Sequence, residues 1–106
     1  MEIWKTQLRK GLLELCVLNV LRHGESYGYE IVQQMKALER LNVTECTVYP
    51  ILARLKKDGY LSVRAVPSPL GPPRRYFSLT ADGQLRVETM NGYWEHLSES
   101  ISKLQR

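Results

Sequence analysis

The fold is decided by residues 43–61, a stretch with the sequence VTECTVYPILARLKKDGYL. Its apolar side chains recur at intervals of three and four residues and therefore share one face of a helix: Val48, Ile51, Leu52 and Leu55. The opposite face carries hydroxyl groups first and positive charge later: Thr47, Tyr49, Arg54 and Lys57. A helix that enters a DNA major groove has this distribution, because its first residues reach base edges and its basic ones bind phosphates. A solvated face of an ordinary amphipathic helix is the alternative.

The start of this helix depends on how Pro50 is accommodated, whereas Gly59 gives a clear stop signal. If Thr44 is the cap, Pro50 lies past the first turn, where it removes a hydrogen bond and can kink the helix. If Thr47 is the cap, Pro50 falls within the first turn, where proline is harmless. The periodicity is compatible with both starts.

The composition is that of one small globular domain. With 106 residues, 43% of them hydrophobic and 25% charged, the chain has room for one domain and an appended helix. No apolar run approaches the length of a membrane span and no signal peptide is recognisable, so we expect a cytoplasmic protein. Neither the two cysteines, Cys16 and Cys46, nor the two histidines have the spacing of a metal site, so we expect no metal and no cofactor. A redox-sensing role for Cys46 is a minor alternative.

The excess positive charge is confined to residues 54–75. The net charge of this stretch is +5, because Asp58 alone opposes six basic residues: Arg54, Lys56, Lys57, Arg64, Arg74 and Arg75. The rest of the chain holds nine basic and ten acidic residues, a net charge of −1. Charge concentrated in this way favours a polyanionic partner, double-stranded DNA above all, over a diffuse solubility role.

Two helices are expected before residue 43. Residues 2–22 are apolar almost all round between 12 and 21, which predicts a buried central helix. Upstream, Trp4 either packs on this domain or reaches a partner subunit. After a turn at 23–25, Ser26 is expected to cap a helix over 27–38 with one apolar stripe: Tyr27, Ile31, Met35 and Leu38. Two helices joined by a short turn, the second with the polar face, predict a helix-turn-helix, in which Tyr27 either packs or reaches a phosphate.

A β-hairpin is expected after Gly59. Apolar and polar side chains alternate over 61–66, and residues 74–79 are rich in β-forming types. Between them, residues 67–73 contain four prolines and are expected to form a loop, because proline cannot continue a sheet. Beside a helix-turn-helix such a hairpin is a wing, and we expect Arg74 and Arg75 to lie along a phosphate backbone or in a minor groove. A solvated hairpin is the alternative.

The last helix is expected over 81–104, with Thr80 as its cap. Its apolar positions alternate at intervals of three and four residues, which is a heptad seam: Val87, Met90, Trp94, Leu97, Ile101 and Leu104. A seam this narrow needs a partner helix, so we expect a homodimer, with Trp4 and Leu8 also at its interface. The alternative is that the seam folds back on the first helix of its own chain.

Three stretches carry a family resemblance: residues 9–15 with 27–31, residues 48–55 (VYPILARL), and residues 71–80 (GPPRRYFSLT). Together they resemble the PadR family of bacterial transcriptional regulators, and the single C-terminal helix resembles its short subfamily. The resemblance runs from Leu8 to Gly83 and is specific because the pieces occur together. It implies a winged helix-turn-helix over 1–80 and a dimerisation helix over 81–106, binding a roughly palindromic operator as a homodimer, usually to repress.

The resemblance also bears on single residues. It puts Pro50 inside the recognition helix and matches four residues to family positions near DNA: Tyr27, Thr44, Thr47 and Tyr49. Cys46 is a departure, because the family commonly has glycine there, and its side chain either tightens or obstructs the approach to DNA. In some short members an aromatic residue of the last helix lines a pore for flat aromatic compounds. Trp94 sits at a similar position. A plain interface tryptophan is the favoured interpretation, and a small aromatic effector bound at Trp94 is the alternative.

These observations favour a DNA-binding transcriptional regulator that is mainly α with a small β-hairpin. Its two recognition helices would enter successive major grooves about 34 Å apart. We expect DNA contacts from Tyr27, Thr44, Thr47, Tyr49, Arg54, Lys57, Arg74 and Arg75. A winged-helix module for protein contacts, without specific DNA binding, is the alternative. An enzyme is not expected, because no paired carboxylates, metal cluster or Ser-His-Asp set stands out.

Overall fold

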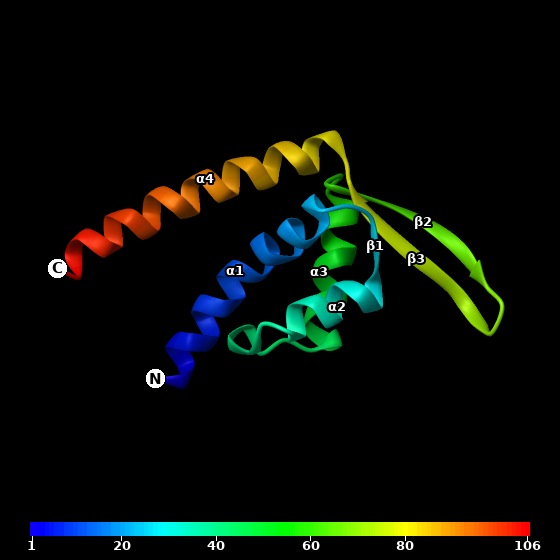
Figure 1. The fold of residues 1–106 in the computed structure, drawn as a ribbon, viewed down its shortest axis with the longest axis horizontal. Coiled ribbons are helices and arrows are strands. Elements are labelled where there is room, and N and C mark those ends of the chain that lie inside the picture. Colours follow the sequence, from blue (N-terminus) through cyan, green and yellow to red (C-terminus); the bar gives the residue numbers. More distant parts are fainter.

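Four α-helices, one short 3-10 helix and a three-stranded antiparallel sheet make up the fold, in a computed structural model that describes all 106 residues (Figure 1). The strand order is β1-β3-β2. In chain order the elements are α1 (Glu2–Arg22), β1 (Ser26–Tyr27), α2 (Gly28–Lys36), η1 (Glu39–Leu41), α3 (Glu45–Lys57), β2 (Leu61–Ser68), β3 (Gly71–Leu79) and α4 (Ala81–Leu104). The architecture confirms the predicted class, a winged helix-turn-helix followed by a long C-terminal helix.

The core forms around α1, as its apolar sequence predicts. Val17 and Leu18 of α1 are completely buried, and α1 contacts α2, α3, α4 and β3. The apolar face predicted for α3 is buried at three positions, with Ile51 partly buried beside them: Val48, Leu52 and Leu55. Burying one such side chain contributes about 1.5–3 kcal/mol, so the core fixes which face of α3 is turned outward.

The start of α3 decides between the two capping alternatives. Thr44 is the N-cap residue, the helix begins at Glu45, and Pro50 lies inside it, so the alternative start at Thr47 is wrong. The Thr44 side chain makes no capping hydrogen bond, and its Oγ1 lies 3.4 Å from the Oγ1 of Thr47 instead. At the other end Gly59 has a φ of +87°, which confirms the predicted stop, because this conformation favours glycine.

The expected cap of the second helix is wrong. Ser26 is buried in β1, where Ser26 and Tyr27 pair with Phe77 and Tyr76 of β3. Helix α2 begins one residue later than expected, and the Glu30 carboxylate accepts a hydrogen bond from the backbone N–H of Tyr27 at 3.1 Å. The helix also ends early, at Lys36, leaving Leu38 of the predicted stripe 60% exposed. Ser26 therefore pairs with a strand some fifty residues away instead of capping the helix that follows it.

The expected loop at 67–73 is also wrong, because both strands of the wing run through the prolines. Ser68 pairs with Gly71, leaving only Pro69 and Leu70 as the turn. The register is irregular between Val66 and Ser68, where Pro67 lies. Proline is tolerated at such irregularities and where a strand has a free edge. Successive backbone nitrogens of a strand point to opposite sides, so one of Pro72 and Pro73 faces the edge that β1 leaves unpaired and the other faces β2 beside the irregular register.

The start of α4 is joined tightly to the end of α3. Thr80 caps the helix as predicted, accepting a hydrogen bond from the Gly83 N–H at 3.0 Å, and it donates one to the Gly59 carbonyl at 2.7 Å. A Cβ atom on Gly83 would lie 2.0 Å from the backbone oxygen of Tyr60, so only glycine allows this approach. The N-terminal half of α4 is therefore part of the same packed body as the helix-turn-helix.

The predicted seam of α4 divides into two parts. Val87 is completely buried and Met90 packs against the core, while the amides of Asn19 on α1 and Asn91 exchange two hydrogen bonds of 2.8 Å. Further along, the seam becomes exposed, and α4 extends from the body on the same side as α1 (Figure 1). No helix combines the length and the apolar character needed to cross a membrane.

Candidate nucleic-acid interface

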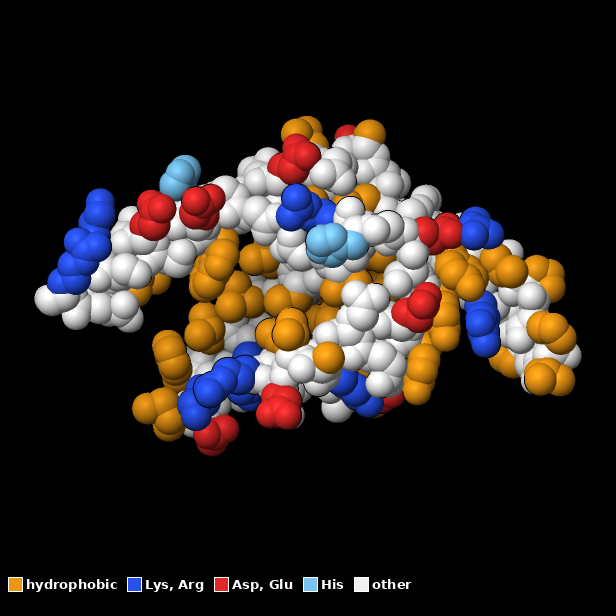
Figure 2. Space-filling model, in the orientation of Figure 1, with side chains coloured by type: hydrophobic (Ala, Val, Ile, Leu, Met, Phe, Trp, Pro, Cys, Tyr) orange, Lys and Arg blue, Asp and Glu red, His pale blue; other side chains and the backbone are white.

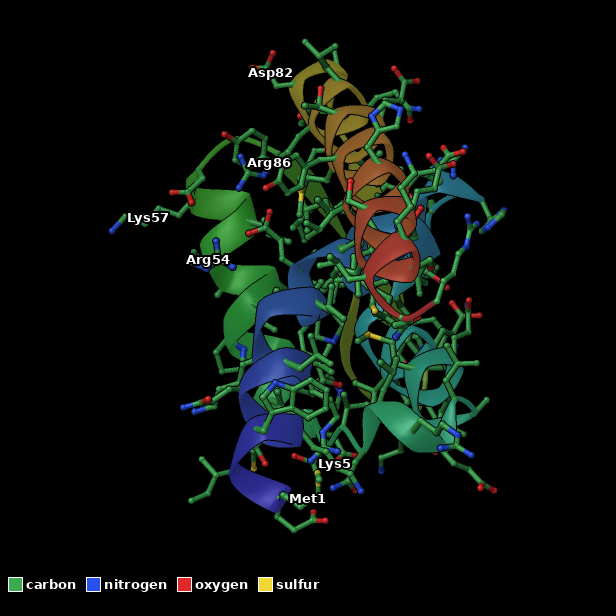
Figure 3. All side chains as sticks on the ribbon, turned by 90° about the vertical axis from the view of Figure 1, so that its left-hand side faces the viewer. Met1, Lys5, Arg54, Lys57, Asp82 and Arg86 are labelled. Atoms are coloured by element: carbon green, nitrogen blue, oxygen red, sulfur yellow. The ribbon has the colours of Figure 1, made fainter.

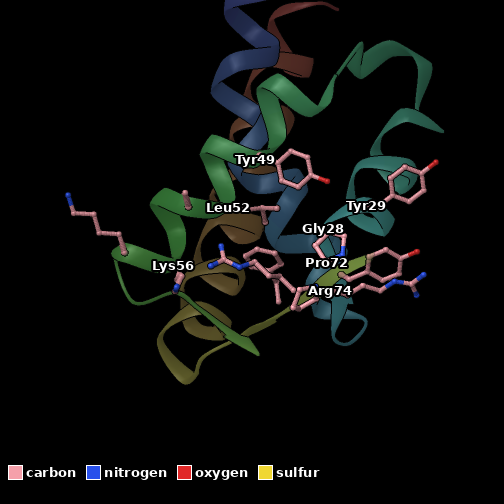
Figure 4. A pocket seen from close by; sticks show the side chains of 13 residues that line it. Gly28, Tyr29, Tyr49, Leu52, Lys56, Pro72 and Arg74 are labelled. Atoms are coloured by element: carbon pink, nitrogen blue, oxygen red, sulfur yellow. The ribbon is translucent and has the colours of Figure 1, made fainter. Parts of the chain in front are cut away.

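A cleft of about 910 Å³ lies between α3, the start of α2 and the β3 strand of the wing (Figure 4). The lysines come from α3, the arginines and prolines come from β3, and aromatic rings come from all three regions. The lining residues are Tyr27, Gly28, Tyr29, Tyr49, Leu52, Ala53, Lys56, Lys57, Pro72, Pro73, Arg74, Arg75 and Phe77. The cleft is thus formed by the outward face of the second helix of the helix-turn-helix and by its wing.

Tyr49 is held in the cleft by a close contact between helices. Its side chain lies so near the start of α2 that a Cβ atom on Gly28 would be 2.8 Å from the ring carbon Cε1. Tyr49 is nevertheless 43% exposed, and its ring is directed into the cleft (Figure 4). A partly exposed tyrosine with a fixed ring offers both an apolar surface and a hydroxyl to a ligand.

Four of the six basic residues in the charged stretch are gathered here without ion pairs: Lys56, Lys57, Arg74 and Arg75. Lys57 lies at the outer edge and points away from the body (Figure 3). No acidic side chain lines the cleft. Two lysines from a helix and two arginines from a strand, with no carboxylate between them, produce a positive potential that suits an anion too extended for one residue to bind.

The other two basic residues are neutralised by glutamates outside the cleft. Arg54 Nη1 lies 3.1 Å from Glu14 of α1 and 4.0 Å from Asp58, and Arg64 makes a bidentate pair with Glu25 at 2.6 and 2.8 Å. The hydrogen bond from Arg64 lowers the pKa of Glu25, and the same contact raises the pKa of Arg64. The structure therefore does not bring these two arginines together with the free cations.

Glu14 joins three helices. Its carboxylate, only 14% exposed, accepts a hydrogen bond from Nε of Arg86 of α4 at 2.7 Å and pairs with Arg54 of α3. Figure 3 shows the two arginines on neighbouring helices. Burial raises the pKa of the Glu14 carboxyl, but the hydrogen bonds from Arg86 and Arg54 outweigh this effect and leave the pKa below its usual value. Arg86 also lies over the ring of Tyr60, with Cζ 4.5 Å from its centroid.

The remaining predicted residues lie at the edges of the cleft or outside it. Tyr27 lines it, beside Arg74. Thr44 and Thr47 lie at the N-terminus of α3 and are not part of the lining, although Thr44 is exposed. Cys46, between them, is exposed with a free thiol. The structure thus brings five of the eight predicted residues into one cleft: Tyr27, Tyr49, Lys57, Arg74 and Arg75.

Sequence reasoning missed several groups that shape this surface. Tyr29 is 54% exposed and stacks on Tyr27, with ring centroids 6.4 Å apart. Glu14 and Glu25 decide which arginines are free. Glu14 had a visible signal, as a single acid within the apolar run 12–21, because a buried charge needs a partner. Glu25, in an ordinary polar turn, had no comparable signal.

A second, apolar hollow of about 330 Å³ lies between α1 and α4. Trp94 lines it together with Gln7, Leu8, Gly11, Leu12, Leu15, Met90, Tyr93 and Leu97. Apolar side chains are visible in the space between the two helices (Figure 2). Apolar side chains of α1 and α4 in and near the hollow remain exposed: Trp4 at 61%, Leu8 at 44%, Trp94 at 39%, Leu97 at 40% and Ile101 at 45%. We call this set the exposed apolar strip, and grouped apolar side chains of this kind often mark a protein–protein interface.

The fold and the cleft define the class: a winged helix-turn-helix protein with a long C-terminal helix. A profile of the PadR-like family of transcriptional regulators matches residues 17–89. The chain is 40% identical to a PadR-like transcription factor from Bacteroides fragilis (94% of this chain, 96% of that one, TM-score 0.80). It is 38% identical to a Streptococcus transcriptional regulator (94% and 98%, TM-score 0.83).

A third solved structure is Bacillus subtilis PadR in complex with operator DNA. The chain is 25% identical to it, covering 74% of this chain and 46% of that one, with a TM-score of 0.67. These matches confirm the resemblance found in the sequence, and the chain belongs to the PadR-like family of transcriptional regulators.

Proposed function

We propose that the protein is a cytoplasmic transcriptional repressor that binds double-stranded DNA as a homodimer at a palindromic operator. The observation that carries the proposal is the cleft with its four unpaired cations beside the outward face of α3. The operator complex of the Bacillus subtilis relative supports the same interpretation.

Within this proposal α3 enters the major groove and β3 follows the phosphate backbone. Thr44, Thr47 and Tyr49 meet bases or nearby phosphates, because short hydroxyl side chains near a helix start reach base edges. The free cations bind phosphates: Lys56, Lys57, Arg74 and Arg75. Arg54 has a lesser part than the sequence suggested, because its guanidinium is already bound to Glu14.

The homodimer rests on the exposed apolar strip of α1 and α4. A second copy would bury the strip and bring two cleft surfaces into two-fold symmetry, as a palindromic operator requires. In this arrangement residues 81–106 are the dimerisation helix and residues 1–80 the DNA-binding domain. The proposed interface consists of Trp4, Leu8, Met90, Trp94, Leu97, Ile101 and Leu104. Val87, which the sequence pattern also predicted there, is completely buried in the core of its own chain and has no surface left for a second copy.

Analytical ultracentrifugation tests the dimer. Trp94→Ala removes the largest side chain of the strip and should shift the protein toward monomer. Leu70→Ala is the matched control, because Leu70 is 99% exposed at the tip of the wing, and it should leave the association unchanged. A Trp94→Ala dimer as strong as the wild type would count against the interface.

Release from DNA by a small aromatic effector is a further part of the proposal, supported by the hollow beside Trp94. The variant Trp4→Phe leaves Trp94 as the only tryptophan, since the chain has two. Titration with a planar aromatic dye should then quench its fluorescence. Unchanged fluorescence up to millimolar dye would leave Trp94 as an interface residue alone.

The central experiment is selection of bound sequences from random duplex DNA, followed by affinity measurements across a salt series. We expect enriched sequences with two-fold symmetry and an affinity that falls steeply as salt rises, because cations that bind phosphates release counterions. No enrichment and no salt dependence would favour the alternative, a winged-helix module for protein contacts.

A further inference from the structure

Three side chains form a row across the sheet at the base of the wing. Tyr27 of β1 pairs with Tyr76 of β3, and Tyr76 pairs with Arg64 of β2, so the three project from one face. The ring centroids of Tyr27 and Tyr76 are 5.6 Å apart, and Cζ of Arg64 lies 5.0 Å from the centroid of the Tyr76 ring. These are the distances of aromatic and cation–π contacts.

Arg74 extends this row into the cleft. It lies two residues before Tyr76 on the same strand and therefore shares its face. Its Cζ is 4.9 Å from the centroid of the Tyr27 ring, and it forms no ion pair. The ring of Tyr27 is thus in contact with the guanidinium of one of the four free cations.

The other end of the row is anchored by Glu25. Arg64 donates from Nε at 2.8 Å and from Nη2 at 2.6 Å to the two carboxylate oxygens of Glu25. Glu25 directly precedes β1, so the pair clamps β2 to the segment that carries Tyr27. A bidentate pair of this kind fixes the plane of the guanidinium. Because its charge is neutralised, Arg64 is better suited to support Tyr76 than to attract a phosphate.

Building on the proposed DNA binding, we propose that Tyr27 is a positioning residue whose ring holds Arg74 ready for a DNA phosphate. The ring is itself braced by the row behind it: Tyr76, Arg64 and Glu25. A mobile arginine side chain loses conformational entropy when it binds a phosphate. An arginine already held against a ring has less entropy to lose, so its binding is more favourable. The role belongs to the ring and not to the hydroxyl. A cation–π contact at an exposed site corresponds to about a two- to fivefold change in affinity.

A double-mutant cycle tests the proposal, with affinity for mixed-sequence duplex DNA measured across a salt series. Tyr27→Phe keeps the ring and should bind like the wild type. Tyr27→Leu should bind about two- to fivefold more weakly, with no further loss in the Arg74→Ala background. Arg75→Ala is the matched control, because Tyr27→Leu should retain its full effect in that background.

Two results would overturn the positioning role. One is a loss for Tyr27→Phe as large as that for Tyr27→Leu, which would assign the effect to the hydroxyl. The other is a Tyr27→Leu loss that persists in the Arg74→Ala background. Glu25→Gln is a second variant that keeps the Tyr27 ring, and it tests the same row of contacts if Tyr27→Leu does not fold. It should cause a smaller loss that also vanishes with Arg74→Ala, and a persistent loss would remove Glu25 from the row.

A measurement without DNA separates this inference from the proposed function. A ring over the Arg74 side chain shifts its Hδ NMR signals upfield, so the shift should appear in the wild type and in Tyr27→Phe and disappear in Tyr27→Leu. If the shift follows this pattern but the wild type has no salt-dependent affinity for DNA, the proposed function fails. If DNA binding is salt-dependent but the shift is absent from the wild type, the positioning role alone fails.

Discussion

Two groups of basic side chains on this molecule have opposite surroundings. The cleft is lined by Lys56 and Lys57 from α3 and by Arg74 and Arg75 from β3, and no carboxylate lines it. One turn away on the same helix, Arg54 is paired with Glu14, which also binds Arg86 of α4. Neighbouring charges on one helix therefore serve different purposes. The first group is available to a polyanion, whereas the second ties α1, α3 and α4 together.

The comparison teaches that the number of positive charges in a sequence is not the number available for binding. A glutamate distant in sequence but close in space can remove an arginine from the binding surface. An arginine between two carboxylates attracts a phosphate less, because its positive charge is already balanced. Substitutions in the first group should therefore weaken DNA binding, and substitutions in the second should lower stability.

The largest effect is expected from Arg74→Ala combined with Arg75→Ala. If each side chain makes one charge-assisted phosphate contact, the loss of both should weaken DNA binding roughly 100-fold. The slope of log affinity against log salt should become shallower by about 2, since each phosphate contact contributes about 0.9. Filter binding or fluorescence anisotropy across a salt series measures both. Unchanged affinity and slope would rule out a wing that contacts DNA.

Glu14→Gln should lower the free energy of unfolding by about 2 kcal/mol, because it replaces charge-assisted hydrogen bonds and leaves Arg54 and Arg86 as adjacent like charges. Urea denaturation measures the difference. Since the folded-state pKa of Glu14 is depressed, its contribution is complete above the unfolded-state pKa of about 4.3 and is lost as the pH falls through the folded-state value. The two proteins should thus converge in stability as the pH is lowered below about 4. A constant difference down to pH 2 would exclude Glu14 as the titrating group.

Lys57→Ala should have a smaller effect, confined to DNA binding. Lys57 is exposed at the edge of the cleft, so its loss should cost about one phosphate contact and make the salt slope shallower by about 1. The midpoint of urea denaturation should not change. A loss of stability without a change in slope would move Lys57 to the structural group.

The smallest effect on DNA binding is expected from Arg54→Ala. The Arg54 guanidinium is already paired with Glu14. The slope of log affinity against log salt should therefore stay the same, and the affinity for DNA should change by less than about twofold. Because the Arg54 side chain is 49% exposed, its pair with Glu14 should contribute about 0.2–1 kcal/mol to stability. A slope reduced as much as in Lys57→Ala would show that Arg54 exchanges Glu14 for a phosphate, and the distinction between the two groups would fail at this residue.

Local patterns predicted most of the architecture. The spacing of Val48, Leu52 and Leu55 identified the buried face of α3, and Thr80 identified the start of α4. Such signals are reliable because helix periodicity and caps act within a few residues. The predictions of a helix cap at Ser26 and of a loop at the wing prolines were wrong because these residues form strands, whose pairing is a long-range contact. Strand pairing between β1 and β3 joins segments some fifty residues apart, and local sequence does not encode the partner.

The candidate site was predicted only in part, because some of its features are local in sequence and others depend on long-range contacts. A concentration of basic residues over 54–75 indicated an anion-binding surface, and the cleft contains four of the six. The two that it lacks, Arg54 and Arg64, pair with residues 40 and 39 positions earlier in the chain. Tyr29 escaped notice because its importance depends on stacking with Tyr27 at the end of a strand that was not foreseen.

Local sequence was enough to predict the class of fold, the helix that carries the outward hydroxyl and basic face, and the stretch in which positive charge accumulates. These are properties of neighbouring residues, and short-range periodicity, capping and composition encode them. The packing of the elements was needed to show which cations remain free, which ring lies against Arg74, and where α4 leaves the core. Those outcomes depend on contacts between segments distant in the chain, such as Glu14 with Arg86, whose partners become known only when the helices pack.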